Sequence, residues 1–401
     1  MVVNKDYKNW HIAYYCQQSI ISIKNYVCYT YCIIHDNNKY IKELIKLLPN
    51  ITLIENMDFL PITDFYIICC HIEASDYAKI SLCNKKIIDV YQTYLAYELP
   101  KIPVNYIVDE YRETEDYYKN YICQKDLLVS KYLQYYIKSR YTLNYQLKLF
   151  NKLEIETINR CNNTCEFCPV NCNMDNRPFK IMDDELYKNI INQLARLKYS
   201  GAVGLFSNNE PLLDKKIVER CKFAREKLPY AYLYIYTNGI LLNLELLCQL
   251  LKYLDYIYID NYNTFKELIP SLKLVQNYLI ENQIDPGKIS IHMRNPKESL
   301  STRAGNAPNN KTPAKIDSHC MLPFSQMIIQ SDGKVSLCSN DALGQVILGN
   351  TKIQSLEEIW HSAEYEKMRT KIKLGRNQID ICQACDAIFT PLPFERIDND
   401  E

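Results

Sequence analysis

Cys161-Asn-Asn-Thr-Cys165-Glu-Phe-Cys168, followed by Pro169, is the most informative segment of this 401-residue chain. Its thiols are four and three residues apart, which gives a Cys-x3-Cys-x2-Cys loop. Cysteine thiolates bind iron–sulfur clusters, and a cubane [4Fe–4S] cluster has four irons to ligate. Three local ligands therefore leave one iron with an open position, at which a small molecule can bind.

The residues just before this loop have the pattern of a β-strand. Leu153-Glu-Ile-Glu-Thr157 alternates apolar and polar residues and contains β-branched ones. A cysteine loop after such a strand resembles the radical S-adenosylmethionine (SAM) superfamily, whose site-differentiated cluster is bound by a loop after the first barrel strand. The resemblance implies that Phe167, the aromatic residue before the third cysteine, lies near the adenine of SAM.

A zinc knuckle and plain buried thiols are the alternatives for the cysteine loop. A structural zinc site needs four tetrahedral ligands, usually supplied by paired Cys-x2–4-Cys clips. Cys172 could supply a fourth ligand, but it lies so close to Cys168 that the loop would be cramped. We therefore predict a SAM-binding [4Fe–4S] cluster on the three thiols of the loop.

The composition argues against several kinds of partner. Lys+Arg and Asp+Glu each number 47, so charge gives no argument for nucleic acid or for an acidic membrane surface. The 17 cysteines, without a secretory signal, indicate a reducing cytoplasm in which thiols stay free or bind metal. Apolar runs such as Phe65–Cys70 are far too short to span a bilayer. We expect a cytoplasmic protein with no nucleic-acid and no membrane partner.

The part of the chain before the cysteine loop carries no recognisable functional motif. All nine glycines lie at or after Gly201, and a Rossmann fingerprint or a P-loop needs glycine for close backbone approach. Apolar runs alternate with helical patterns there, which predicts an α/β domain over residues 1–114 and a helical linker over 115–150. A partner-binding or substrate-gating module is the simplest expectation for this region.

Strand and helix signals alternate from residue 151 to residue 312. Such a run of βα units predicts an α/β fold built on a parallel sheet or barrel, with ligand chemistry at the carboxyl ends of the strands. The superfamily resemblance makes this a partial (β/α)6 TIM-like barrel.

One turn of this barrel departs from the superfamily pattern. Ser207-Asn-Asn-Glu-Pro211 stands where the superfamily usually has Gly-Gly-Glu-Pro, which helps to bind the amino group of the methionine part of SAM. Asn208 and Asn209 replace the glycines. Asparagine tolerates a positive φ better than other residues with a side chain, so we expect the turn to survive. The resemblance implies that Asn209 and Glu210 contact SAM.

Three further side chains are predicted at the same cavity. Asp260 matches an acidic position that ends the fourth strand in many members and contacts the ribose, and Arg294 could pair with the SAM carboxylate as a fork, with a surface arginine as the alternative. Arg303 lies 17 residues before Cys320, and an arginine at this offset approaches the substrate in a related aminocyclitol dehydrogenase. We predict that Arg303 binds or deprotonates a substrate hydroxyl.

A second set of cysteines lies after the barrel, in residues 313–401. Its members are Cys320, Cys338, Cys382 and Cys385, spaced Cys-x17-Cys-x43-Cys-x2-Cys. A predicted hairpin at Ile328–Leu337 and a helix begun by the capping box Ser355-Leu-Glu-Glu358 lie between them. The ligand types alone would suit a structural zinc ribbon. The whole pattern resembles the twitch domain, a shortened SPASM domain, which implies an auxiliary [4Fe–4S] cluster on the four thiols.

Together these features predict a radical SAM oxidoreductase. The resemblance implies that an external flavodoxin- or ferredoxin-type donor reduces the first cluster, and that reductive cleavage of SAM gives a 5′-deoxyadenosyl radical that abstracts hydrogen from the substrate. A cluster ligated only by cysteine has no site for substrate, so the second cluster is expected to accept an electron during net oxidation of a small sugar- or cyclitol-like alcohol. The alternatives are a maturase that modifies a peptide or protein, and a catalytically silent cluster protein that binds a partner.

Overall fold

The computed structural model describes residues 147–285 and 287–389, five strands before them, and scattered positions between 116 and 142. By its internal contacts the chain divides into two compact units. One comprises Met1–Pro100 with most of the C-terminal end, and the other comprises Lys101–Phe389. The predicted boundaries at residues 114, 150 and 312 stay predictions.

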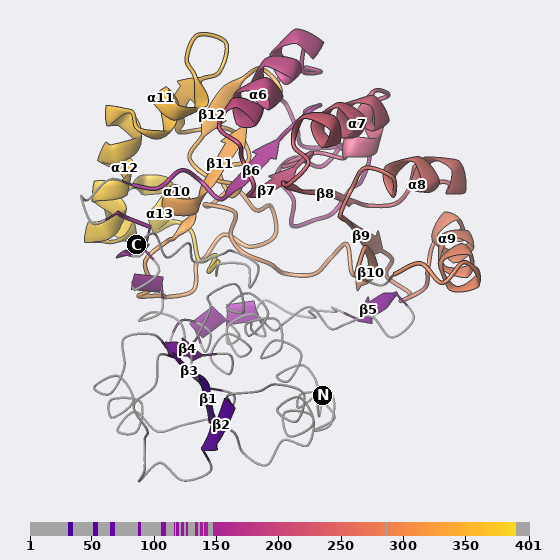
Figure 1. Cartoon of the computed structure of the whole chain (residues 1–401), viewed down its shortest axis with the longest axis horizontal. Coiled ribbons are helices and arrows are strands. Elements are labelled where there is room, and N and C mark those ends of the chain that lie inside the picture. The colour runs from indigo at the N-terminus through magenta and orange to yellow at the C-terminus, as the bar shows by residue number, and fades with distance from the viewer. Residues whose placement is uncertain are drawn as a thin grey trace. The chain divides into compact units, whose positions relative to one another are not determined.

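The first unit contains a four-stranded parallel sheet with strand order β2-β1-β3-β4 (Figure 1). The strands are β1 (Tyr31–Ile34), β2 (Ile51–Ile54), β3 (Phe65–Ile68) and β4 (Ile87–Asp89). They fall on apolar runs rich in isoleucine and tyrosine, which favour extended backbone. Another such run, Ile12–Tyr15, lies outside the described residues.

The second unit is built on a nine-stranded sheet with order β13-β12-β11-β6-β7-β8-β9-β10-β5. The strands are β5 (Ile107–Asp109), β6 (Lys152–Ile155), β7 (Ala202–Gly204), β8 (Tyr232–Thr237), β9 (Tyr256–Tyr262), β10 (Ile289–Arg294), β11 (Gln326–Ile329), β12 (Lys334–Ser336) and β13 (Ile347–Asn350). Neighbours from β11 through to β5 are parallel, whereas β12 and β13 are antiparallel. The strand signals predicted between residues 151 and 312 correspond to β6 to β10. The edge strand β5 comes from before the predicted linker, and the sequence did not predict it.

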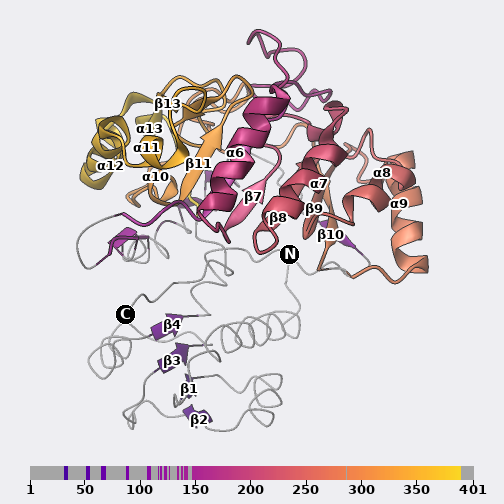
Figure 2. The ribbon, with the colours of Figure 1, turned by 45° about the horizontal axis from the view of Figure 1, so that its top comes forward.

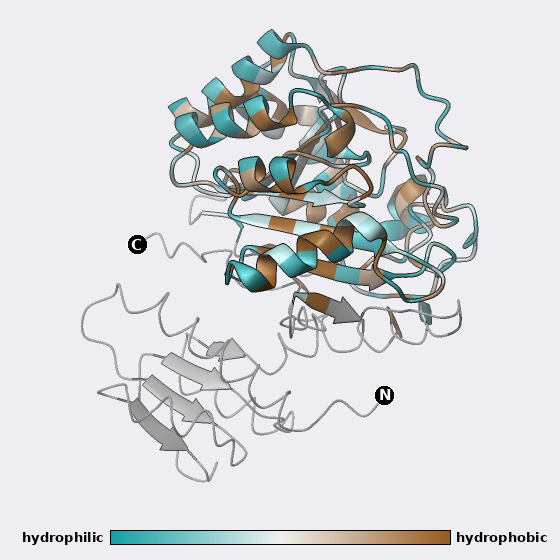
Figure 3. Ribbon diagram, turned by 90° about the vertical axis from the view of Figure 1, so that its right-hand side faces the viewer, coloured by the Kyte–Doolittle hydropathy of each residue, from teal (hydrophilic) through white to brown (hydrophobic). Residues whose placement is uncertain are grey.

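The helices α6 (Asp184–Arg196), α7 (Ile217–Lys227), α8 (Leu244–Leu250) and α9 (Pro270–Glu281) connect these parallel strands. Figure 2 shows them in chain order across one face of the sheet. In α6, Leu186, Ile190 and Leu194 are buried at a spacing of four residues, so one stripe of the helix packs inward. Figure 3 shows that helices of this unit carry both hydrophobic and hydrophilic residues, as this arrangement requires.

The segment after the barrel extends the same sheet and then becomes helical. The predicted hairpin is confirmed, because β11 pairs with β12 around Gly333, whose φ is 89°. The capping box is confirmed as well, because Ser355 Oγ accepts from Glu358 N (3.2 Å) and Glu358 Oε2 accepts from Ser355 N (2.7 Å). The helices here are α10 (Leu322–Ser325), α11 (Leu356–Trp360), α12 (Ala363–Leu374) and α13 (Asp380–Gln383).

The core of this segment forms around a buried arginine. The guanidinium of Arg369 lies 4.2 Å from the ring centroids of both Trp360 and Tyr365, and each of the three side chains is at most 1% exposed. Arg369 also donates to the carbonyl oxygens of Pro323 (2.8 Å) and Trp360 (2.7 Å). Within the described residues, none of the helices has the length and apolar character needed to cross a membrane.

Candidate active site

A cavity of about 300 Å³ lies among the strand ends and loops that carry the predicted site residues. The cysteine loop, the turn after β7, the ends of β8 to β10 and the segment around Arg303 all contribute to its wall. The predicted residues that line it are Cys161, Cys165, Phe167, Cys168, Asn209, Glu210, Asp260, Arg294 and Arg303. Parallel strands place their carboxyl ends on one side of a barrel, which is why residues so distant in sequence meet there.

The cysteine loop is closed by a side chain that the sequence did not single out. Asn171 is buried, and its Nδ2 donates to the carbonyl oxygens of Cys165 (3.0 Å) and Cys168 (2.9 Å). The amide of Cys168 also donates to the carbonyl of Cys165 (3.1 Å). One asparagine thus fixes the backbone that presents two of the three thiols. No pattern in the sequence separates it from the other asparagines of this loop.

Without a bound metal, the buried thiols of the loop stay protonated. The pKa of Cys161 is raised to about 12, chiefly by burial and in smaller part by the nearby Glu210 and Cys168. Burial likewise raises the pKa of Cys165, to which Cys168 and Cys161 contribute. Cluster ligation requires thiolates, so iron binding here displaces protons that the buried thiols otherwise keep.

Glu210 lines the cavity, but its carboxylate is engaged by the protein. Oε1 accepts from Leu212 N (3.0 Å) and Thr237 Oγ1 (2.7 Å), and Oε2 accepts from Asn238 N (2.8 Å). Burial raises the pKa of Glu210 to about 7, although these donors lower it. The side chain therefore fastens the turn after β7 to the end of β8. Its predicted contact with SAM stays a prediction.

Arg294 is half-buried, and the sequence did not reveal its ion partner. Its side chain is 11% exposed, and its Nε donates to Glu298 Oε1 (2.7 Å), which belongs to a carboxylate buried four residues further on. Its Nη1 also lies 3.6 Å from Asp260 Oδ1. The rings of Phe167 and Tyr262 meet beside this pair at a centroid distance of 5.8 Å. Arg294 and Glu298 are four residues apart, a spacing that predicts an ion pair only within a helix. This segment is not helical, so the sequence gave no sign of the pair.

The turn Ser207–Pro211 was expected to need a positive φ at its asparagines, and the structure does not show one. Among the described residues with positive φ, neither Asn208 nor Asn209 appears, so the turn does not need the conformational freedom of glycine. Asn209 Oδ1 accepts from Ser207 N (2.8 Å), while its Nδ2 is buried and has no hydrogen-bond partner. Arg303 donates from Nη2 to Asn208 Oδ1, and its Nε is likewise buried without a partner. Two residues that line the cavity thus each hold a buried N–H donor without a partner, which is uncommon in folded proteins.

The second cysteine set also comes together. Burial raises the pKa of Cys338, and the thiols of Cys320, Cys385 and Cys382 raise it further. In the part of the chain that the structure describes, no three Cys, His, Asp or Glu side chains are grouped tightly enough to hold one metal ion. The mutual influence of these thiols shows that they are neighbours, as ligands of one centre must be.

Comparisons with known proteins agree with this geometry. Residues 155–268 match the family model of the radical SAM superfamily. Residues 320–386 match SPASM, an iron–sulfur cluster-binding domain. The chain thus carries a radical SAM domain followed by a SPASM domain. The predicted radical SAM resemblance and the cofactors, which are SAM, a [4Fe–4S] cluster and auxiliary iron–sulfur in the SPASM region, are thereby confirmed.

Relatives of this radical SAM enzyme include a dehydrogenase. The S-adenosyl-L-methionine-dependent 2-deoxy-scyllo-inosamine dehydrogenase of Niallia circulans is 28% identical over 242 residues, which are 60% of this chain and 94% of the relative. The crystal structure of BtrN in complex with AdoMet and 2-DOIA is 27% identical, with a TM-score of 0.52, and covers the same shares of the two chains. Selenomethionine-labelled BtrN in an open conformation is 24% identical, with a TM-score of 0.46, over the same shares. The predicted partial barrel is confirmed.

Proposed function

We propose that this radical SAM enzyme dehydrogenates one alcohol carbon of a small aminocyclitol or a similar sugar-like polyol. The observation that carries the proposal is the cavity itself, where the three-cysteine loop and Arg303 form parts of one wall. The relative that covers 60% of this chain is a 2-deoxy-scyllo-inosamine dehydrogenase, which supports this substrate class.

Each group of site residues is proposed to have its own role. The loop thiols hold the SAM-binding cluster, and Phe167, Asn209, Glu210, Asp260 and Arg294 bind SAM. When bound and reduced, this pair of cofactors supplies a primary carbon radical that takes a hydrogen atom from an unactivated C–H bond. The other four thiols hold the auxiliary cluster, which accepts the second electron of the oxidation. An external one-electron donor of flavodoxin or ferredoxin type supplies the first cluster, and the cysteine content supports a cytoplasmic location.

Arg303 is proposed to act on the alcohol oxygen. Arg303 lines the cavity, and in the described part of the chain no carboxylate lies within ion-pair distance of its guanidinium, so its positive charge is not neutralised there. A cation beside the substrate oxygen stabilises the negative charge that develops there as the hydroxyl proton leaves. The rings of Phe206 and Tyr236, stacked at 4.6 Å, line the same cavity and give it an aromatic surface.

The test uses the anaerobically reconstituted, dithionite-reduced enzyme with SAM and 2-deoxy-scyllo-inosamine. We expect a substrate-dependent rise in 5′-deoxyadenosine and a ketone that is two mass units lighter than the alcohol. With substrate deuterated at the ring carbons, deuterium is expected in the 5′-deoxyadenosine, and Cys165→Ala is expected to abolish both products. Release of 5′-deoxyadenosine that the cyclitol neither accelerates nor labels would overturn the substrate class while leaving the superfamily assignment intact.

A further inference from the structure

We propose that Asn208 is a positioning residue that fixes the guanidinium of Arg303 at the wall of the cavity. The superfamily usually has glycine at this position, and glycine has no side chain with which to make such a contact. The proposal rests on the proposed function only for the identity of the ligand that Arg303 meets.

The side-chain amide of Asn208 joins three segments that are distant in sequence. It lies in the turn after β7, four residues beyond Gly204, and is 8% exposed. Its Oδ1 accepts from Arg303 Nη2, and its Nδ2 donates to the carbonyl oxygen of Ser339 (3.2 Å), the residue after Cys338. Both functions of the amide are therefore used, and each one ties the turn after β7 to a different part of the site.

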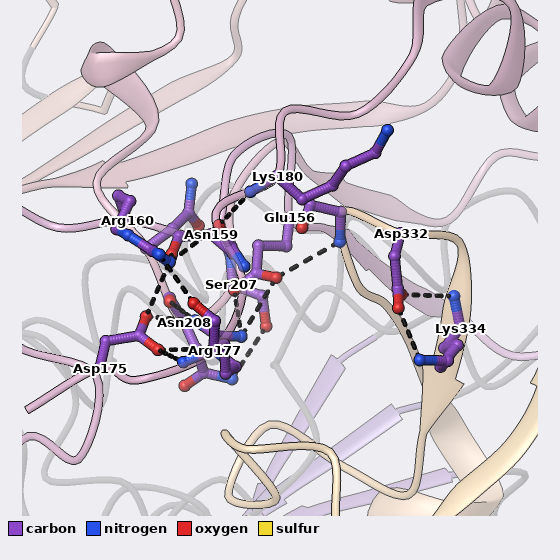
Figure 4. Close-up of polar contacts among 12 residues, drawn as sticks. Glu156, Asn159, Arg160, Asp175, Arg177, Lys180, Ser207, Asn208, Asp332 and Lys334 are labelled. Carbon is purple, nitrogen blue, oxygen red and sulfur yellow. Dashed lines mark hydrogen bonds and ion pairs between the residues drawn. The ribbon is translucent and has the colours of Figure 1, made fainter.

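The backbone of Asn208 is held from the opposite side. Arg177 Nη2 donates to the carbonyl oxygen of Asn208 (3.4 Å). Arg177 is itself fixed by two carboxylates, Asp175 Oδ2 at 2.9 Å and Glu156 Oε1 at 3.0 Å, whose side chains are at most 2% exposed. Figure 4 shows Asn208 beside this group of buried charges. Held on both sides, Asn208 presents its Oδ1 in one fixed place.

Contacts of the neighbouring residues fix the backbone of Arg303. These contacts alone do not fix the position of its long side chain. Arg303 and Ala304 have φ of 49° and 56°, values that non-glycine residues adopt only where their surroundings impose them. The restraint comes from Thr302, whose N donates to Asp386 Oδ1 (2.9 Å) and whose Oγ1 donates to the carbonyl of Ala384 (2.6 Å). Asp386 is fully buried and follows Cys385. These contacts fix the position of the Arg303 Cα atom, and the hydrogen bond to Asn208 fixes the position of the guanidinium.

The choice of asparagine has a chemical consequence. A neutral amide oxygen accepts one N–H of the guanidinium and leaves its full charge available, whereas a carboxylate in the same place would form an ion pair with it. Arg303 and Asn209 both line the cavity, and Nε of the first and Nδ2 of the second are buried without a partner. A guanidinium whose charge is left free by Asn208 suits a ligand with oxygen acceptors, and a polyol carries such atoms.

The first experiment follows Arg303 directly and needs no substrate. Phenylglyoxal modifies exposed guanidinium groups, and mass spectrometry of peptides gives the rate at Arg303 relative to Arg294 in the reconstituted full-length enzyme. We expect Asn208→Gly to raise this ratio about tenfold, because the Arg303 guanidinium loses its hydrogen bond, and Asn208→Asp to lower it. An unchanged ratio in Asn208→Gly overturns the proposal.

The control is Asn243→Ala, which removes the N-cap of α8, where Asn243 Oδ1 accepts from Leu246 N (2.9 Å). It destabilises the fold at a position that does not line the cavity. A ratio that rises equally in this variant would show general loosening and would also overturn the proposal. Asn208→Ala replaces the glycine variant if the latter does not fold.

The second experiment measures the dissociation constant of 2-deoxy-scyllo-inosamine by calorimetry. Asn208→Gly is expected to weaken binding about tenfold in the wild-type background and not at all in an Arg303→Met background, because the two residues act as a unit. Equal weakening in both backgrounds contradicts the positioning role. If the wild-type enzyme does not bind this cyclitol, the proposed function fails, and the phenylglyoxal ratio still decides the role of Asn208.

Discussion

Glu156 illustrates at a single side chain how burial competes with charge. The residue is 2% exposed, and Arg177 lies 3.0 Å from it. Burial raises its pKa from 4.5 to about 7, although the guanidinium lowers it. At a pH between these two pKa values, Glu156 is therefore protonated in the folded protein and ionised in the unfolded chain. The contribution of Glu156 to stability is complete below about pH 4.5 and is lost as the pH rises through about 7.

The Glu156→Gln variant is expected to remove this pH dependence. A glutamine still accepts from Arg177 and carries no proton that titrates. Between about pH 5 and about pH 8, the unfolding free energy of the wild-type enzyme should fall more steeply than that of the variant, by at most about 1.4 kcal/mol per pH unit. Thermal unfolding in a series of buffers measures both slopes, and identical slopes would contradict the assigned titration.

Asn171 offers a second prediction for one residue. Its Nδ2 holds the carbonyls of Cys165 and Cys168, so Asn171→Ala leaves two acceptors of the cluster loop without a partner. We expect the variant to lose the SAM-binding cluster at least several times faster than the wild type, since such contacts contribute about 1 kcal/mol each. Iron release under a chelator, followed by spectroscopy, measures this. The auxiliary cluster is the internal control, and equal retention of the first cluster would contradict the clamp.

Among the secondary-structure elements, those with a local signature could be predicted from the sequence and those without one could not. The hairpin around Gly333 and the capping box at Ser355 depend on residues within a few positions of one another. Strand β5 is three residues long and gains its place by pairing with β10, some 180 residues further on. The conformation of Asn208 likewise depends on contacts with Arg177 and Ser339. Pairing and burial across such distances leave no pattern in one sequence, so these features required the structure.

The segment Arg303-Ala304-Gly305 yields a prediction for a loop. Ala304 has a φ of 56°, where a Cβ is strained, so Ala304→Gly should raise the free energy of unfolding by up to about 1 kcal/mol. Gly305→Ala is the matched reverse change, because Gly305 has a φ of 81° and an added Cβ would lie 3.1 Å from Ala384 Cβ. Denaturant unfolding of both variants should give opposite signs. Two shifts of the same sign would contradict the assigned conformation.

At the scale of the whole catalytic unit, one sheet carries both cysteine sets. Strand β11 of the SPASM region pairs in parallel with β6 of the barrel, with Gln326 opposite Lys152 and Ile329 opposite Ile155. Asp386 adds a second tie by binding the backbone of Thr302. The two cysteine sets are therefore fixed relative to each other by main-chain pairing. The sequence predicted each set but gave no sign of this shared strand pair.

This arrangement predicts that losing the auxiliary cluster separates SAM cleavage from substrate oxidation. A Cys382→Ala, Cys385→Ala double variant keeps the barrel, the first three thiols and the cavity. We expect it to release 5′-deoxyadenosine but to yield less than about one hundredth of the wild-type ketone, because the substrate radical lacks its electron acceptor. Chromatography of both products in the same reaction measures the ratio. Full ketone production by this variant would contradict the proposed role of the second cluster.

The most direct test of the account is the iron, sulfide and zinc content of the anaerobically reconstituted enzyme and of two variants. We predict about eight irons and about eight sulfides per chain in the wild type. About four of each are expected after replacement of Cys161, Cys165 and Cys168 by alanine, and again after replacement of Cys320, Cys338, Cys382 and Cys385. About four irons with one zinc in the wild type would show that the second cysteine set holds zinc and not a cluster. A wild-type protein that takes up no iron would contradict both cluster sites.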